Sequence, residues 1–178
     1  MTTPATPSGH ALAQNGDLGT RLLHLIDGLY GPDDLSPAKV EYLTGLPIGR
    51  DPEDPHRYGF GAMLDDTWAC NLASIPDRRG GPPKRLVVSV DNIARRADAR
   101  LPAATPEFSG FASELRTCGY AQSAIAGPRG ALYGHRFVRG DVAVDVQTER
   151  EDAQAMPVRF RVMQLVVTAG AAAEVVHG

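Results

Sequence analysis

The residues with the clearest chemical potential lie in one short run, YGFGAMLDDTWACNLASI, at positions 58–75. It holds two close glycines, Asp65, Asp66, Cys70 and the chain's single tryptophan. Close glycines can cradle a phosphate, and a thiol beside carboxylates can serve as a nucleophile. A phosphate loop, however, opens a helix, whereas here apolar residues alternate on both sides of an acidic turn. This alternation predicts a half-buried β-hairpin with Cys70 on its buried face, where a thiol is a poor nucleophile.

Other candidate catalytic residues lack partners. His135 is predicted on the same strand face as Phe137, whereas Asp145 falls on the opposite face, so no carboxylate orients the imidazole as a general base. The loop DPEDPH at 51–56 offers oxygen and imidazole ligands, but its spacing matches no calcium or zinc pattern. We therefore predict no catalytic residue, no metal and no cofactor. An enzyme or small-molecule-binding domain with an unrecognised pocket is retained as an alternative.

Length and composition predict a single domain over residues 17–168, since 178 residues with 43% apolar content can bury a sizeable core. Residues 1–16, MTTPATPSGHALAQNG, have no basic start and no apolar stretch, which predicts a disordered tail and not a signal peptide. Residues 169–178 are predicted to form a C-terminal tail. No apolar run approaches the ~20 residues of a membrane span, so we expect a cytoplasmic protein, or a periplasmic one if a leader has been removed.

Cys70 and Cys118 have no metal or redox spacing and are expected to be reduced, with one disulfide as the alternative.

Capping residues and periodicity predict three helices. The first covers 17–30, the second follows Ser36 as N-cap and stops at Gly45, and the third has Thr105 as N-cap and stops at Gly119. A further helical turn is predicted over 93–100. The predicted strands are the hairpin at 58–75 and the segments KRLVVSVDN, YAQSAIA, GALYGHRFV, VAVDVQT and VRFRVMQLVV.

The tight-turn pair Gly140-Asp141 fixes one strand register in advance. If Arg139 lies opposite Val142, then Phe137 faces Val144, Tyr133 faces Thr148, and Arg136 faces Asp145 as a cross-strand ion pair. In the last predicted strand both faces become apolar after Val162, which indicates cover on both sides or a β-bulge. Together these patterns predict an α+β fold: a meandering antiparallel sheet with two or three helices packed on one face.

Charge is distributed unevenly along the chain. Residues 1–77 hold eleven Asp/Glu and four Lys/Arg, a balance of −7, whereas residues 78–178 hold ten and fourteen, a balance of +4. The basic half has no cluster of cations interleaved with aromatics, so nucleic-acid binding is not predicted. The acidic half carries three negative turns, which either serve solubility alone or form a patch that attracts a basic protein partner, with two neighbouring side chains as anchors. The predicted partner-binding residues are Asp33, Asp34, Asp51, Glu53, Asp54, Tyr58, Met63, Asp65 and Asp66.

The order LSPAKVEYLTG, a glycine-rich aromatic strand, FASELRTCGY and FVRGDVAVDV resembles that of small bacterial immunity proteins, which neutralise a toxin delivered by a contact-dependent or type VI secretion system. The resemblance covers roughly residues 35–167 and concerns the layout, so it assigns no individual residue. It implies a non-enzymatic inhibitor whose exposed loops plug a toxin's active site, and a basic toxin such as a nuclease would suit the acidic half. A secretion chaperone, which is also small, acidic and α+β, is the main alternative binding protein.

Overall fold

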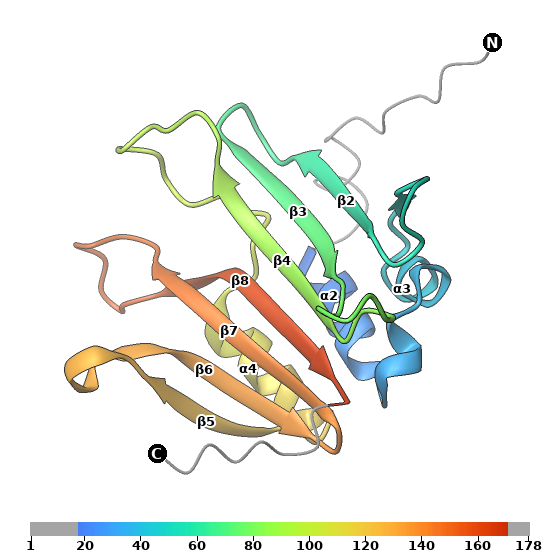
Figure 1. Ribbon diagram of the computed structural model, residues 1–178. Coiled ribbons are helices and arrows are strands. Elements are labelled where there is room, and N and C mark those ends of the chain that lie inside the picture. The colour runs from blue at the N-terminus through green and yellow to red at the C-terminus, as the bar shows by residue number, and fades with distance from the viewer. Residues whose placement is uncertain (1–17, 171–178) are drawn as a thin grey trace.

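The computed structural model describes residues 18–170, which contain three α-helices and one eight-stranded antiparallel sheet (Figure 1). This confirms the α+β class. The predicted N-terminal tail and residues 171–178 of the predicted C-terminal tail lie outside the described residues. None of the helices within residues 18–170 has the length and apolar content that a membrane crossing requires.

Helices α2 (Leu18–Asp27) and α3 (Pro37–Thr44) flank a 3₁₀ turn, η1 (Pro32–Leu35). Helix α2 is shorter than predicted, because the chain turns at Gly28 before reaching Tyr30. The caps of α3 are confirmed. The Ser36 hydroxyl accepts a hydrogen bond from the backbone of Lys39 at 3.4 Å, and Gly45 adopts the left-handed conformation with φ 65°.

Helix α4 (Phe108–Thr117) begins later than predicted. Its N-cap is Glu107, whose carboxylate accepts the backbone N–H of Ser109 at 3.2 Å. Thr105, the predicted cap, is buried and its hydroxyl instead donates to the Pro102 carbonyl at 2.7 Å. The helical turn predicted over 93–100 was also wrong, since that segment forms only turns and irregular structure.

The sheet consists of two meanders joined at its centre. The first meander contains β1 (Gly49–Arg50), β2 (Tyr58–Met63), β3 (Trp68–Ile75) and β4 (Arg85–Asn92). The second contains β5 (Ala121–Ala126), β6 (Leu132–Arg139), β7 (Val142–Arg150) and β8 (Phe160–Ala169), and a short 3₁₀ turn, η2 (Pro128–Gly130), links β5 to β6. The strand order is β1-β2-β3-β4-β8-β7-β6-β5, so the antiparallel β4–β8 pair unites the two halves.

Most of the predicted register of the β6–β7 hairpin is confirmed. Arg139 pairs with Val142, and the neighbouring pairs follow in the predicted order as far as His135 opposite Val146. The predicted pair of Tyr133 with Thr148 was wrong, because the β6–β7 ladder ends at His135. The expected irregularity in the last strand is confirmed as a register shift between β7 and β8 beside Val162.

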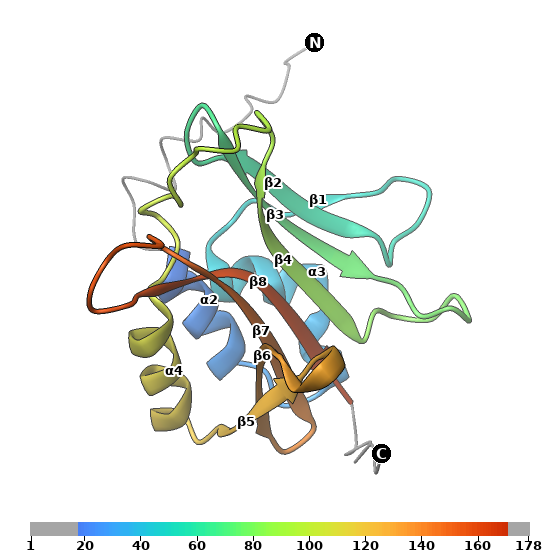
Figure 2. The same ribbon diagram turned by 90° about the vertical axis from the view of Figure 1, so that its left-hand side faces the viewer.

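The core lies where the helices meet the sheet (Figure 2). Alternate residues of the long strands are buried, for example Leu72, Leu86 and Val144, each at most 2% exposed. Helices α2 and α4 contribute Leu25, Ile26 and Leu115 to the same cluster. Burial of such apolar surface is the main stabilising contribution, at about 25 cal/mol per Å².

Candidate protein-binding site

The β2–β3 hairpin uses its acidic turn and glycines for its own folding. The Asp65 carboxylate accepts the backbone N–H groups of Thr67 and Trp68 at 2.7 and 2.8 Å, which closes the turn. A side chain at Gly59 would meet the Leu72 carbonyl oxygen at 2.5 Å, so this glycine permits the close approach of β3. Gly61 lies in the same strand and opens no helix. The hairpin is therefore confirmed, and its geometry is not that of a phosphate loop.

Both cysteines are free thiols, as expected. Cys70 is 1% exposed, and burial, reinforced by the charge of Asp91, raises the pKa of its thiol to about 12. Cys118 is half-buried, and its pKa is also raised, mainly by burial and then by Asp27. Neither thiol is activated for nucleophilic chemistry.

We expect an alkylating reagent at pH 8 to modify only Cys118 in the folded protein, with Cys70 reacting after unfolding in urea. The raised pKa lowers the thiolate fraction of Cys70 roughly a thousandfold, and burial also blocks access. Mass spectrometry of the modified peptides measures both rates, and the Cys118→Ala variant provides the matched control. Rapid labelling of Cys70 in the native state would contradict the buried hairpin face.

His135 has aromatic and amide neighbours. Its ring stacks on Phe108 with centroids 4.4 Å apart, and its Nδ1 lies 3.3 Å from the Gln122 amide nitrogen. Burial lowers the pKa of His135. Asp145 instead binds Arg136 with oxygen–nitrogen distances of 2.6 and 2.7 Å, as the predicted cross-strand pair. In residues 18–170, no group of three or more His, Cys, Asp or Glu side chains is arranged to hold a metal.

The three acidic turns do not form one surface. Asp65 and Asp66 follow the last residue of β2, whereas the loop with Asp51, Glu53 and Asp54 precedes its first residue. The Asp33-Asp34 turn is connected to that first end, because the Tyr58 hydroxyl donates to the carbonyl of Leu35, the last residue of η1. Two of the predicted acidic turns therefore lie toward one end of β2 and the third lies at the other.

The two predicted anchors differ in their exposure. Tyr58 is 5% exposed, its hydroxyl is bonded to Leu35, and its backbone N–H donates to the Ser74 hydroxyl at 2.9 Å. Tyr58 therefore stabilises the core, and we no longer count it among the candidate partner-binding residues. Met63 is 39% exposed at the end of β2 and remains available.

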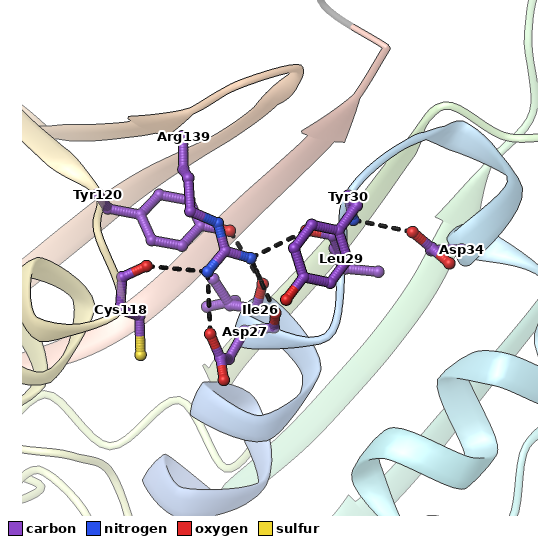
Figure 3. Close-up of polar contacts among 8 residues, drawn as sticks. All are labelled: Ile26, Asp27, Leu29, Tyr30, Asp34, Cys118, Tyr120 and Arg139. Carbon is purple, nitrogen blue, oxygen red and sulfur yellow. Dashed lines mark hydrogen bonds and ion pairs between the residues drawn. The ribbon is translucent and has the colours of Figure 1, made fainter.

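A residue that the sequence analysis missed, Arg139, organises the surface around the C-terminal end of α2 (Figure 3). Its Nη1 donates to the Asp27 carboxylate and to the Cys118 carbonyl, both at 2.9 Å. Its Nη2 donates to the carbonyls of Asp27 and Leu29 at 2.8 and 3.0 Å, with Ile26 at 3.5 Å. One guanidinium thus satisfies carbonyls that the ends of α2 and α4 leave without helical partners.

Two tyrosines enclose this guanidinium. The Cζ atom of Arg139 lies 4.9 Å from the ring centroid of Tyr30 and 4.5 Å from that of Tyr120, within the range of cation–π attraction. Tyr120 is buried, and burial raises its pKa to about 12, so its hydroxyl stays protonated and donates to the Ile26 carbonyl at 2.9 Å. Tyr30 covers the other side and is 73% exposed.

Tyr30 is an exposed aromatic residue held in a defined position. Its ring lies against Arg139, and its backbone N–H donates to the Asp34 carboxylate at 2.8 Å. The same carboxylate accepts the N–H of Gly31 at 3.1 Å, and Asp33 is exposed beside it. We name the segment of Tyr30, Asp33 and Asp34 the Tyr30 turn. It combines an exposed aromatic ring that lies against a guanidinium with two carboxylates, a chemistry that suits contact with a basic protein.

Comparisons with protein-family models, with curated proteins and with solved structures gave no match to this chain.

Proposed function

We propose that this chain is a non-enzymatic protein-binding module, an immunity protein that neutralises a basic bacterial toxin, such as a nuclease, in the cytoplasm. The observation that supports the proposal is the Tyr30 turn, where a ring exposed by 73% lies against Arg139 and the backbone N–H of the same residue donates to Asp34. Tyrosine is enriched among residues that dominate binding energy. A ring already held in place loses less conformational entropy when a partner covers it.

We infer that the helices pack on one face of the sheet, because alternate strand residues are buried and the intervening ones are more exposed, as Asn71 and Ala73 beside Leu72 illustrate. With that packing, turns at the sheet ends carry most of the exposed charge. The acidic loop at 51–57 and the Tyr30 turn then lie toward the same end of β2, and their carboxylates accelerate the approach of a cationic protein.

The proposal is tested by capturing partners of the tagged full chain from the source organism's lysate, at low and then at high salt, with identification by mass spectrometry. We expect one stoichiometric basic protein, released or weakened by salt. When expressed alone that protein should be toxic, and co-expression of this chain should restore growth. Capture of no such protein, or of one whose toxicity the chain does not relieve, would overturn the proposal.

Neutralising the acidic loop gives a further prediction. The triple variant Asp51→Asn, Glu53→Gln, Asp54→Asn should weaken binding by about tenfold, mainly through slower association at low salt. Its free energy of unfolding should change by less than ~1 kcal/mol, since these side chains make only local contacts within the loop, such as the 3.3 Å ion pair of Asp54 with Arg57, and the amides keep an oxygen that can accept the backbone N–H groups of Glu53 and His56. Association rates and urea unfolding measure the two effects. A stability loss of several kcal/mol would show that the loop is structural.

A second candidate, a small-molecule-binding domain, is favoured by one observation. A groove of about 550 Å³ lies between α2 and α4, and its lining includes Leu23, His24, Glu107 and Phe111. Thermal-shift measurements with metal ions and metabolites test this candidate. A saturable rise in melting temperature that is lost in Leu23→Trp, which fills the groove, would support it.

A further inference from the structure

The two edges of the sheet are built differently. On one edge β1 has only two residues, Gly49 and Arg50, and the charged Asp51 and Pro52 follow at once. On the other edge β5 has six residues, AQSAIA, with no charge and no proline. Within residues 18–170, β5 lies at the edge of the sheet and pairs only with β6 (Figure 1). Every β5 residue except Ile125 is exposed.

Edge strands expose unpaired backbone donors and acceptors, and proteins usually protect them by short length, charge, proline or bulges. The β1 edge has the first three of these features. The β5 edge has only a register shift between Ile125 and Ala126, at its end. Five residues, Ala121–Ile125, therefore present a regular unprotected edge that is suited to pairing with another strand.

We propose that β5 pairs with β5 of a second copy of this chain, antiparallel, about a twofold axis at Ser123. Such an axis places a residue opposite its own counterpart, so a charged residue there would meet an identical charge. All of β5 is neutral. Arg136, the β6 neighbour of Ser123, is already bound to Asp145 at 2.6 Å.

The register follows from the length of the regular segment. Ser123 is its middle residue, so an axis there pairs all five residues: Ala121 with Ile125 of the second copy, and Gln122 with Ala124. Residues directly opposite in an antiparallel pair lie on the same face of the sheet. Ala121 and Ile125 are four residues apart in sequence, and Gln122 and Ala124 are two apart. Because side chains alternate between the two faces along a strand, both pairs meet this condition. The result is a continuous sheet of two copies.

The oligomeric state tests the pairing. Light scattering of the full chain over a concentration series should show the mass rise from 19.0 kDa toward twice that value, because a short edge interface gives a concentration-dependent equilibrium. Ser123→Lys places two ammonium groups opposite each other and should hold the mass at 19.0 kDa, with the melting temperature that the wild type has at concentrations where it is monomeric. Ser123→Thr, a neutral substitution with good strand propensity, should still form the dimer. A wild-type mass of 19.0 kDa at every concentration up to about 1 mM would overturn the proposal.

Cross-linking distinguishes this interface from any other dimer. Across the axis the two Cα atoms of residue 123 would lie roughly 4.5–5.5 Å apart, within the range that a disulfide spans. Ser123→Cys, in a Cys118→Ser background, should oxidise to a covalent dimer. Ser113→Cys on the exposed side of α4 is the matched control and should not. A dimer that persists in Ser123→Lys and resists cross-linking at position 123 would place the interface elsewhere and overturn the assignment.

Discussion

Replacing Arg139 by methionine is expected to lower the free energy of unfolding by about 3 kcal/mol, which corresponds to a melting temperature lower by roughly 6–12 °C. Methionine keeps an apolar stem but removes every donor. The guanidinium bonds to carbonyls at the ends of two helices, and its side chain is only 19% exposed. The ion pair with Asp27 contributes little of this effect, because that carboxylate is 55% exposed. Carbonyls left without a donor and the lost stacking against two tyrosines account for most of it.

The same strand supplies a matched control in Arg136. It makes a bidentate ion pair with Asp145 at 2.6 and 2.7 Å, but its side chain is 44% exposed. Arg136→Met should therefore cost less than about 1 kcal/mol. Arg139→Lys should recover only part of the loss. Its ammonium group still donates hydrogen bonds, but it cannot reach both helix ends as the planar guanidinium does. Equal effects of the two methionine variants in urea unfolding would contradict a special role for Arg139.

Local patterns predicted those parts of the fold that local chemistry determines. The hairpin at 58–75 follows from period-two alternation, and the β6–β7 register follows from the Gly140-Asp141 turn, with Gly140 at φ 55°. In both cases the interacting residues lie close in sequence. The N-terminus of α4 was misplaced because Thr105 is a preferred N-cap type and Glu107 is not, whereas in the structure Thr105 is buried and Glu107 caps the helix.

Contacts between segments that are far apart in the sequence could not be predicted from local sequence patterns. Arg139 meets the end of α2 across 110–113 residues, and in the sequence it is only one arginine near the end of a strand. The long-range contact of Tyr58 was likewise not predictable from the local sequence. Its alternation correctly predicted a strand, but its role depends on Leu35, 23 residues away. The partner-binding site could therefore be predicted only as acidic turns, and the residue that fixes Tyr30 had to come from the structure.

Replacing Tyr30 by alanine is expected to raise the dissociation constant for the captured partner by about 30-fold, or ~2 kcal/mol of binding free energy. The ring is 73% exposed, so a partner can cover it, and it is already held against Arg139. The free energy of unfolding should fall by less than ~1 kcal/mol, because Tyr120 and the carbonyl acceptors still hold the guanidinium. Titration calorimetry measures the affinity, and urea unfolding measures the stability of the same variant.

Tyr133→Ala is the matched control, since that tyrosine is 60% exposed at the start of β6 and has no guanidinium against its ring among the cation–π contacts of the described residues. It should change the dissociation constant by less than about twofold.

Asp33→Asn should act differently from Tyr30→Ala: loss of one exposed charge slows association at low salt and has little effect on dissociation. If Tyr30→Ala binds normally while the acidic-loop triple variant does not, the partner contacts residues 51–54 and the Tyr30 turn serves only to close α2. Full loss of binding in Tyr30→Ala, with unchanged stability, would make the aromatic ring the anchor and the acidic loop an accessory that speeds encounter.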